Sequence, residues 1–80
     1  MNREEVKSKL NGIFCTVFEK DDIKIHDAMT AAEVEEWDSI NHINLIVSVE
    51  KGFKVSFTTK EVQGLKNVGQ LIDLISRRIP

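Results

Sequence analysis

The sequence of 80 residues lacks the features that mark several large classes of protein. It contains one cysteine, so it cannot form an internal disulfide, and a reducing compartment suits it. No apolar run approaches the ~20 residues needed to cross a bilayer, and residues 1–5 lack the apolar core of a signal peptide. We therefore expect a cytoplasmic protein that does not associate with membranes.

Basic residues are too few for a nucleic-acid-binding protein. The chain has 11 Lys and Arg residues against 13 Asp and Glu residues, a net charge of -2. Nucleic-acid binding depends on clustered cations that neutralise phosphates, and the pair Arg77-Arg78 is too short for that. With 41% apolar and 30% charged residues, the composition is that of one small globular domain. Such a domain has little room for a substrate cleft with a full catalytic site, which favours a binding or carrier role.

The few side chains that could ligate a metal or act as nucleophiles do not form a recognisable pattern. Neither His26 nor His42 has a second ligand at the spacing of a metal site. His42 falls beside Leu45 and Val49 on a helical wheel, and we interpret it as partly buried with one hydrogen bond. Cys15 falls on the polar face of the first predicted helix, as a surface thiol without a role. The sequence predicts neither a metal site nor a catalytic residue.

Helical periodicity dominates the first half of the chain. Asn2 and Glu5 have the spacing of a capping box and begin a first amphipathic helix. Residues 19–38 show no sustained periodicity and predict a long loop, in which Thr30 and Glu33 cap one short helical turn. The apolar stripe of the first helix is Val6, Leu10, Ile13, Phe14, Val17 and Phe18. The loop residues expected to pin it to the helices are Ile23, Ile25, Met29, Val34 and Trp37.

A second helix is predicted from Asp38-Ser39 to Gly52, where glycine is a usual stop signal. Residues 53–57 alternate like a strand but have no partner strand, so we interpret them as an extended connector. A capping box at Thr58 starts a short third helix, which we expect to end at Gly64.

A last helix is predicted to begin after Asn67, which with Gln70 repeats the capping pattern. Its apolar face consists of Val68, Leu71, Ile72, Ile75 and Ile79. The expected fold is all-α, a three- to four-helix bundle with a long loop between the first and second helices.

The start of the second helix combines two features that favour a function. Asp38-Ser39 before an apolar helix is, in most proteins, only an N-cap. Here the serine follows a long loop in a small helical chain, and the unsatisfied N–H groups and positive dipole end of the helix favour a bound phosphate.

The second helix is also more apolar than its expected packing requires. Its apolar side chains cover an arc of about 220° at ~3.6 residues per turn, whereas packing on one side of a bundle needs a stripe of about 100°. We assign Leu45, Ile46 and Val49 to the core. The remaining residues, Ile40, Ile43 and Val47, are predicted to form an exposed apolar patch beside Ser39.

With these residues in place, the chain resembles an acyl carrier protein of the fatty acid and polyketide type, almost end to end. The family's Asp-Ser-Leu attachment motif appears here as Asp38-Ser39-Ile40. Family core positions are matched by Leu45, Val49 and Phe53, and the last helix by Val68, Leu71 or Ile72, and Ile75. The resemblance implies a single acyl carrier domain over residues 1–80.

The resemblance also implies a covalent cofactor, and a carrier that does no catalysis of its own. In the family, a phosphopantetheinyl transferase moves 4'-phosphopantetheine from coenzyme A onto the motif serine. The thiol of this arm then carries acyl groups as thioesters between acyl-loading and acyl-transferring enzymes. Ser39 would be the attachment point, Asp38 would cap the helix and help the transferase and its metal engage, and Ile40 would pack against the transferase. The partner-binding face would be Ile40, Ile43, Asn44 and Val47, on a protein expected to be a monomer.

One departure from the family concerns charge on the second helix. Fatty-acid carriers usually display an acidic second helix that cationic enzymes recognise. This chain has Asn41 and Asn44 where acids are frequent, and Lys51 adds a positive charge. Its acids cluster before the serine instead, at Glu33, Glu35 and Glu36. A carrier dedicated to one pathway therefore fits better than a general fatty-acid carrier.

Two alternatives remain open at the level of sequence. An aminoacyl or peptidyl carrier would share the fold and the serine, and differ only in its loading enzyme. A helical adaptor without a prosthetic group would use Ile40, Ile43 and Val47 to dock a partner.

Overall fold

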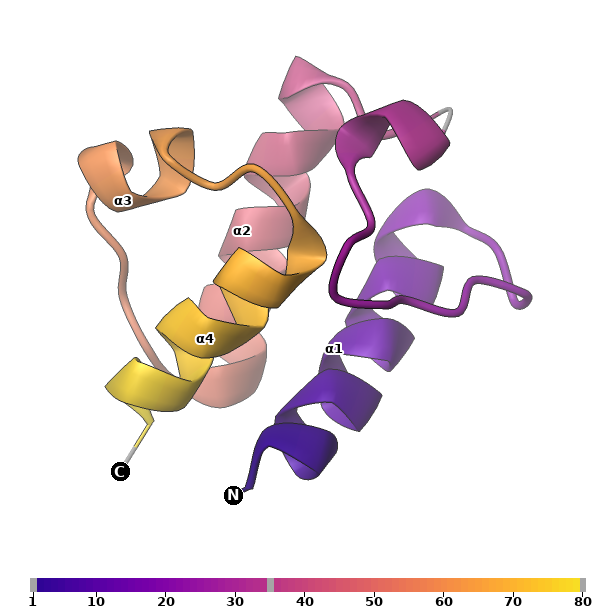
Figure 1. The fold of residues 1–80 in the computed structure, drawn as a ribbon. Helices are drawn as coiled ribbons and strands as arrows, with labels where there is room; N and C mark the ends of the chain where they lie inside the picture. The colour runs from indigo at the N-terminus through magenta and orange to yellow at the C-terminus, as the bar shows by residue number, and fades with distance from the viewer. Residues whose placement is uncertain (1, 35, 80) are drawn as a thin grey trace.

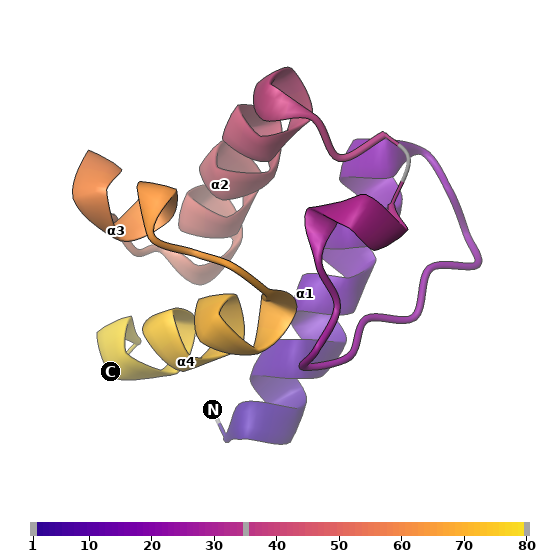
Figure 2. The same ribbon diagram turned by 45° about the horizontal axis from the view of Figure 1, so that its top comes forward.

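The structure is a computed structural model that describes residues 2–34 and 36–79. It has four α-helices, α1 (Arg3–Phe18), α2 (Ser39–Phe53), α3 (Thr59–Gln63) and α4 (Val68–Arg78), with a 3-10 turn η1 (Ala31–Glu33) in the long loop after α1. Helices α1 and α2 run in opposite directions, and α1 packs against both α2 and α4, with its start and the end of α4 at the same end of the bundle (Figures 1 and 2). The described residues contain no strand, and the all-α prediction is confirmed with four helices.

Helix α1 begins and packs as its sequence predicts. The side chain of Asn2 accepts a hydrogen bond from the backbone N–H of Glu5 at 2.9 Å, and the Glu5 carboxylate accepts one from the N–H of Asn2 at 3.2 Å. This reciprocal pair satisfies two N–H groups that the first turn would leave unpaired. The predicted stripe lies inside the bundle, with Val6, Leu10, Phe14 and Phe18 buried and Ile13 and Val17 partly buried.

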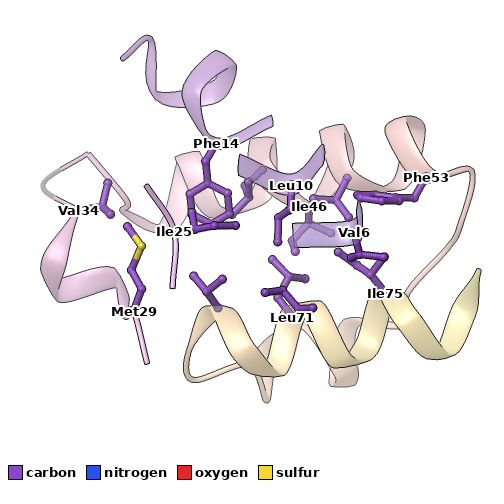
Figure 3. Close-up of a cluster of buried hydrophobic side chains, with 14 of the residues drawn as sticks. Val6, Leu10, Phe14, Ile25, Met29, Val34, Ile46, Phe53, Leu71 and Ile75 are labelled. Atoms are coloured by element: carbon purple, nitrogen blue, oxygen red, sulfur yellow. The ribbon is translucent and has the colours of Figure 1, made fainter. Parts of the chain in front are cut away.

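The core is built from α1, α2, α4 and the long loop together, as Figure 3 shows for the labelled residues. Loop residues Ile25, Met29 and Val34 are buried in it, so the loop contributes to the core as the sequence predicts. Leu74 of α4 is also buried, although the predicted stripe omits it. It lines a surface hollow with Leu65, on the side of α4 that the short α3 covers.

Hydrogen bonds fix the long loop to α1 and α4. The Asn11 side chain donates to the carbonyl of Ile23 at 2.9 Å and accepts from the N–H of Ile25 at 2.8 Å. Cys15 is half-buried beside this contact, with its sulfur 3.7 Å from the Ile23 carbonyl oxygen, so the prediction of a surface thiol is wrong. Sequence periodicity placed Cys15 on the polar face of α1, but the returning loop covers that face. In the middle of the loop, the carbonyl of Asp27 accepts a hydrogen bond from the N–H of Gly69 in α4 at 2.8 Å.

The end of α2 differs from the prediction. Helix α2 continues through Gly52 to Phe53, and the residue that leaves the helix is Lys54, in a left-handed conformation with φ of 56°. Ile13 of α1 packs closely against Gly52, because a Cβ atom there would lie 3.0 Å from the terminal methyl of Ile13. Phe53 is buried, and its helical conformation directs it into the core. The connector that follows is tied to α2, because the N–H of Val55 donates to the Glu50 carbonyl at 3.0 Å.

The other predicted helix boundaries are confirmed. The capping pair Thr58 and Glu61 begins α3, which Gly64 ends. Asn67 accepts from the N–H of Gln70 at 2.9 Å and begins α4.

Candidate functional site

Ser39 is the first residue of α2, and its side chain is exposed. The preceding residue, Asp38, caps the helix by accepting a hydrogen bond from the N–H of Asn41 at 2.9 Å. Because Asp38 provides the cap, the Ser39 hydroxyl is not needed for it, and it makes no hydrogen bond within residues 2–34 and 36–79. The N–H groups of Ser39 and Ile40 likewise have no acceptor there. Among the described residues, nothing therefore competes with an incoming phosphate group for this hydroxyl and these two amides at the positive end of a helix.

The loop that leads to Ser39 is held in place from two sides. The Asn41 side chain donates to the backbone carbonyl of Glu36 at 2.7 Å, and Lys20 lies 3.1 Å from the Glu36 carboxylate. Of the predicted acidic cluster, Glu33 accepts from the N–H of Thr30 at 2.9 Å, and Glu35 lies outside the described residues. Two of these acids therefore serve to order the loop.

A cavity of about 670 Å³ opens beside Ser39. It lies between the beginning of α2, the short α3 and the segment that leads into α4. Figure 2 shows how these three segments are arranged. One wall comes from the end of the long loop and the start of α2: Ala31, Trp37, Asp38, Ser39, His42 and Ile43. The facing wall consists of Thr59, Val62, Gln63, Leu65, Lys66, Asn67 and Leu71. A group attached to Ser39 would therefore have a largely apolar hollow next to its attachment point.

Trp37 and His42 form a hydrogen-bonded pair in the first wall. The indole Nε1–H of Trp37 donates to Nδ1 of His42 at 3.0 Å. Trp37 also packs edge-on against Phe14 of α1, with ring centroids 5.3 Å apart. The prediction that His42 is partly buried with one hydrogen bond is confirmed. Sequence reasoning treated Trp37 only as a loop anchor, and the indole donor five residues before an imidazole was the available signal for this pair.

The apolar residues of α2 are buried or exposed as the helical wheel predicts. Leu45, Ile46 and Val49 are buried. Ile40 is 73% exposed, Ile43 63% and Val47 42%, and these three are the large hydrophobic side chains found exposed among the described residues. Asn44, next to them, is also exposed. The four residues form a continuous, uncharged surface on α2, which we call the apolar face.

The strongest electrostatic contacts lie away from Ser39. Arg3 of α1 pairs with Asp27 of the loop at 2.9 Å and with Asp73 of α4 at 3.2 Å. A hydrogen bond from the Arg3 guanidinium lowers the pKa of the Asp27 carboxyl. Backbone and side-chain hydrogen bonds from Thr58, with the Arg78 guanidinium, lower the pKa of Glu61 in α3. These pairs connect secondary-structure elements. The charged residues near Ser39 are Asp38, the Glu36–Lys20 pair and Lys66 on the facing wall of the cavity.

Two kinds of structural site are not found. Residues 2–34 and 36–79 contain no group of three His, Cys, Asp or Glu side chains that could hold a metal ion. None of the helices described in the structure is long and apolar enough to span a membrane.

Comparison with known proteins assigns the fold to the class of small helical carriers. No protein-family model matches the chain. The solution structure of a holo acyl carrier protein from Geobacter metallireducens has a TM-score of 0.87 and 41% sequence identity, and the match covers 91% of this chain and 84% of that one. An acyl carrier protein of Thermosynechococcus vestitus is 28% identical over 79 residues, which is 99% of this chain and 98% of that protein. The chain belongs to the acyl carrier protein family.

Membership of this family makes the chain a carrier and not a catalyst, and it implies a phosphopantetheine prosthetic group. The residues at the start of α2 fit such a group. Ser39 supplies an exposed hydroxyl, and the amides of Ser39 and Ile40, which have no acceptor within residues 2–34 and 36–79, can bind a phosphate oxygen. The adjoining cavity has space for part of an arm.

Proposed function

We propose that Ser39 carries 4'-phosphopantetheine, and that the arm's thiol holds acyl groups as thioesters. The enzymes served belong to a fatty acid, polyketide or related dedicated biosynthetic pathway. The observation that carries this proposal is the free, exposed hydroxyl of Ser39 at the first residue of α2, beside a cavity, in a member of the acyl carrier protein family.

A phosphopantetheinyl transferase catalyses the attachment of the arm to Ser39. The Ser39 oxygen gives up its proton to the enzyme and forms a bond to the phosphorus that bears the pantetheine. The pyrophosphate bond of coenzyme A breaks, and the adenosine bisphosphate leaves. Asp38 supports this step from the carrier's side, because it caps α2 and so holds the serine at the helix start while leaving its hydroxyl free.

We further propose that the apolar face of α2, Ile40, Ile43, Asn44 and Val47, binds the transferase and the acyl-transferring enzymes. Its large exposed side chains adjoin the attachment residue, so an enzyme that reaches the arm must cover them. Because Asn41 and Asn44 replace the acids frequent in the family, we expect the partners to dock through apolar contact more than through charge. This mode of docking supports service to a dedicated pathway. We propose that the carrier is monomeric and cytoplasmic.

The proposed modification is tested by incubating the protein with coenzyme A and a broad-specificity transferase, followed by intact mass measurement. We expect the wild-type protein to gain the mass of one phosphopantetheine and Ser39→Ala to gain none. Ser39→Ala should keep its circular dichroism spectrum and melting temperature, because Asp38 still caps α2. A wild-type protein that stays unmodified would favour the unmodified adaptor instead. Both relatives are acyl carriers by name, which supports acyl over aminoacyl cargo.

A further inference from the structure

The hydrogen bond between Trp37 and His42 connects the wall of the cavity to the core of the bundle. Trp37 contacts two aromatic rings of α1, Phe14 at 5.3 Å and Phe18 at 6.3 Å between centroids. Its indole ring also lies nearly parallel to the imidazole of His42, at 20° with centroids 6.1 Å apart. His42 is therefore held by a partner that is itself fixed by core packing.

This contact determines which nitrogen of His42 carries the proton. An indole N–H can only donate a hydrogen bond, so Nδ1 of His42 must accept it. The neutral imidazole then has its proton on Nε2, which becomes a donor. Within residues 2–34 and 36–79, this Nε2–H has no acceptor, although His42 is half-buried.

The donor is placed next to the attachment residue. His42 follows Ser39 by three residues on α2, so the two side chains lie on neighbouring turns of one helix face. Both line the same cavity of about 670 Å³. Two other residues of the lining use a side-chain oxygen elsewhere, since Asp38 caps α2 and Asn67 caps α4. His42 thus adds to the cavity wall a half-buried N–H donor that no group among residues 2–34 and 36–79 accepts.

We propose that His42 is a positioning residue for the arm carried on Ser39, and that its Nε2–H donates a hydrogen bond to a carbonyl oxygen of that arm. Trp37 acts through His42, by fixing the tautomer and the orientation of the imidazole. The acceptor is an amide carbonyl of the arm or the thioester carbonyl of its cargo, which share the same chemistry. This inference rests on the proposed modification of Ser39 and adds a residue that holds the arm against the cavity wall.

The test is nuclear magnetic resonance of the ¹⁵N,¹³C-labelled protein in apo, holo and acyl-loaded forms, each first verified by intact mass. In the holo or acyl form we expect NOEs between the His42 ring and the arm. We also expect solvent exchange of the His42 Nε2 proton to slow about fivefold, the ratio corresponding to a net hydrogen bond of about 1 kcal/mol. His26 is the internal control, because it lies outside the cavity and its signals should not change. A contact already present in the holo form identifies an arm amide, and one found only after loading identifies the thioester.

Matched variants separate a positioning role from a structural one. His42→Gln keeps an N–H donor near the position of Nε2, whereas His42→Phe keeps a ring but no donor. We expect ¹⁵N relaxation of the arm amides to report order in wild type and His42→Gln, and a mobile arm in His42→Phe. Trp37→Phe keeps the packing on Phe14 but loses the indole N–H, so it should release the His42 tautomer and loosen the arm.

The outcomes distinguish failure of this inference from failure of the proposed function. A protein that gains no mass contradicts the modification of Ser39 and the inference with it. A modified protein in which His42 shows no NOE and unchanged exchange contradicts the inference alone. Equal arm mobility in His42→Phe and wild type would contradict it as well. If Trp37→Phe unfolds, the two His42 variants still decide the result.

Discussion

Substituting Ile43 and Leu45 one at a time tests which face of α2 points into the core. Ile43 is 63% exposed and Leu45 is 0% exposed, although they lie only two positions apart. We expect Ile43→Glu to fold normally and to impair delivery of the arm, because it places a charge in the apolar face. Leu45→Ala should show the opposite behaviour, with a less stable domain and normal transfer per folded molecule.

The expected sizes follow from burial. Cutting a fully buried leucine to alanine costs about 2–5 kcal/mol, because apolar contacts are lost and a cavity remains. A surface substitution usually changes the free energy of unfolding by no more than about 0.5 kcal/mol. For a domain of this size, 1 kcal/mol shifts the melting temperature by about 4–8 °C. Leu45→Ala should therefore melt at least about 8 °C below wild type, and Ile43→Glu within about 4 °C of it.

The assay pairs a thermal melt, followed by circular dichroism, with the rate of phosphopantetheine transfer measured by intact mass. Because Ile43 also lines the cavity, Ile40→Glu is the matched control. Ile40 is 73% exposed and lies outside the cavity lining, so it tests docking alone. If Ile43→Glu unfolds the domain and leaves transfer per folded molecule unchanged, the assignment of core and partner faces is wrong.

Three further predictions concern packing, pH and charge. Gly69→Ala should destabilise the domain by about 1–3 kcal/mol, because the new Cβ would lie 2.9 Å from the Asp27 carbonyl oxygen. Gly12→Ala faces open space and should stabilise the domain by roughly 0.5–1 kcal/mol. Thermal melts check both variants, and equal losses of stability would contradict the packing at Gly69. The lowered pKa of Asp27 means that its pairing with Arg3 stabilises the protein above about pH 4 and is lost as the pH falls through that lowered pKa. The melting temperature of Asp27→Asn should thus lie below that of wild type at pH 7 and approach it near pH 2. A difference in melting temperature that stays constant as the pH is lowered would refute this. Asn44→Glu should speed exchange with enzymes that serve acidic carriers at low salt but not at high salt, with Asn44→Gln unchanged; a gain that persists at high salt would argue against steering by charge. Asn44 is the better site for that change, since Asn41 holds the Glu36 carbonyl at 2.7 Å.

The features that the sequence predicted correctly depend on local spacing. Capping pairs such as Asn2 with Glu5 lie three residues apart, so both partners and their geometry are contained in one turn of helix. The division of α2 into buried Leu45 and exposed Ile43 follows from helical period and the size of the bundle. Ser39 at the start of α2 follows from its position after Asp38, although its modification remains a proposal.

The features that the sequence did not reveal depend on contacts between distant segments. Gly52 is a usual helix stop, but here α1 packs against it, and the helix runs on to bury Phe53. Cys15 is half-buried because the returning loop places the Ile23 carbonyl beside it. The pairing of Trp37 with His42 requires the loop to be folded back onto Phe14, which no periodicity in the sequence encodes.

The most direct test of the carrier function is to purify the protein from its own cells and map the peptide that contains Ser39 by tandem mass spectrometry. We predict that this serine bears phosphopantetheine, and that part of the population carries an acyl group removed by neutral hydroxylamine, as expected of a thioester. The released acyl group would also identify the pathway. An unmodified Ser39 in the native protein, or an arm found on another residue, would contradict the account.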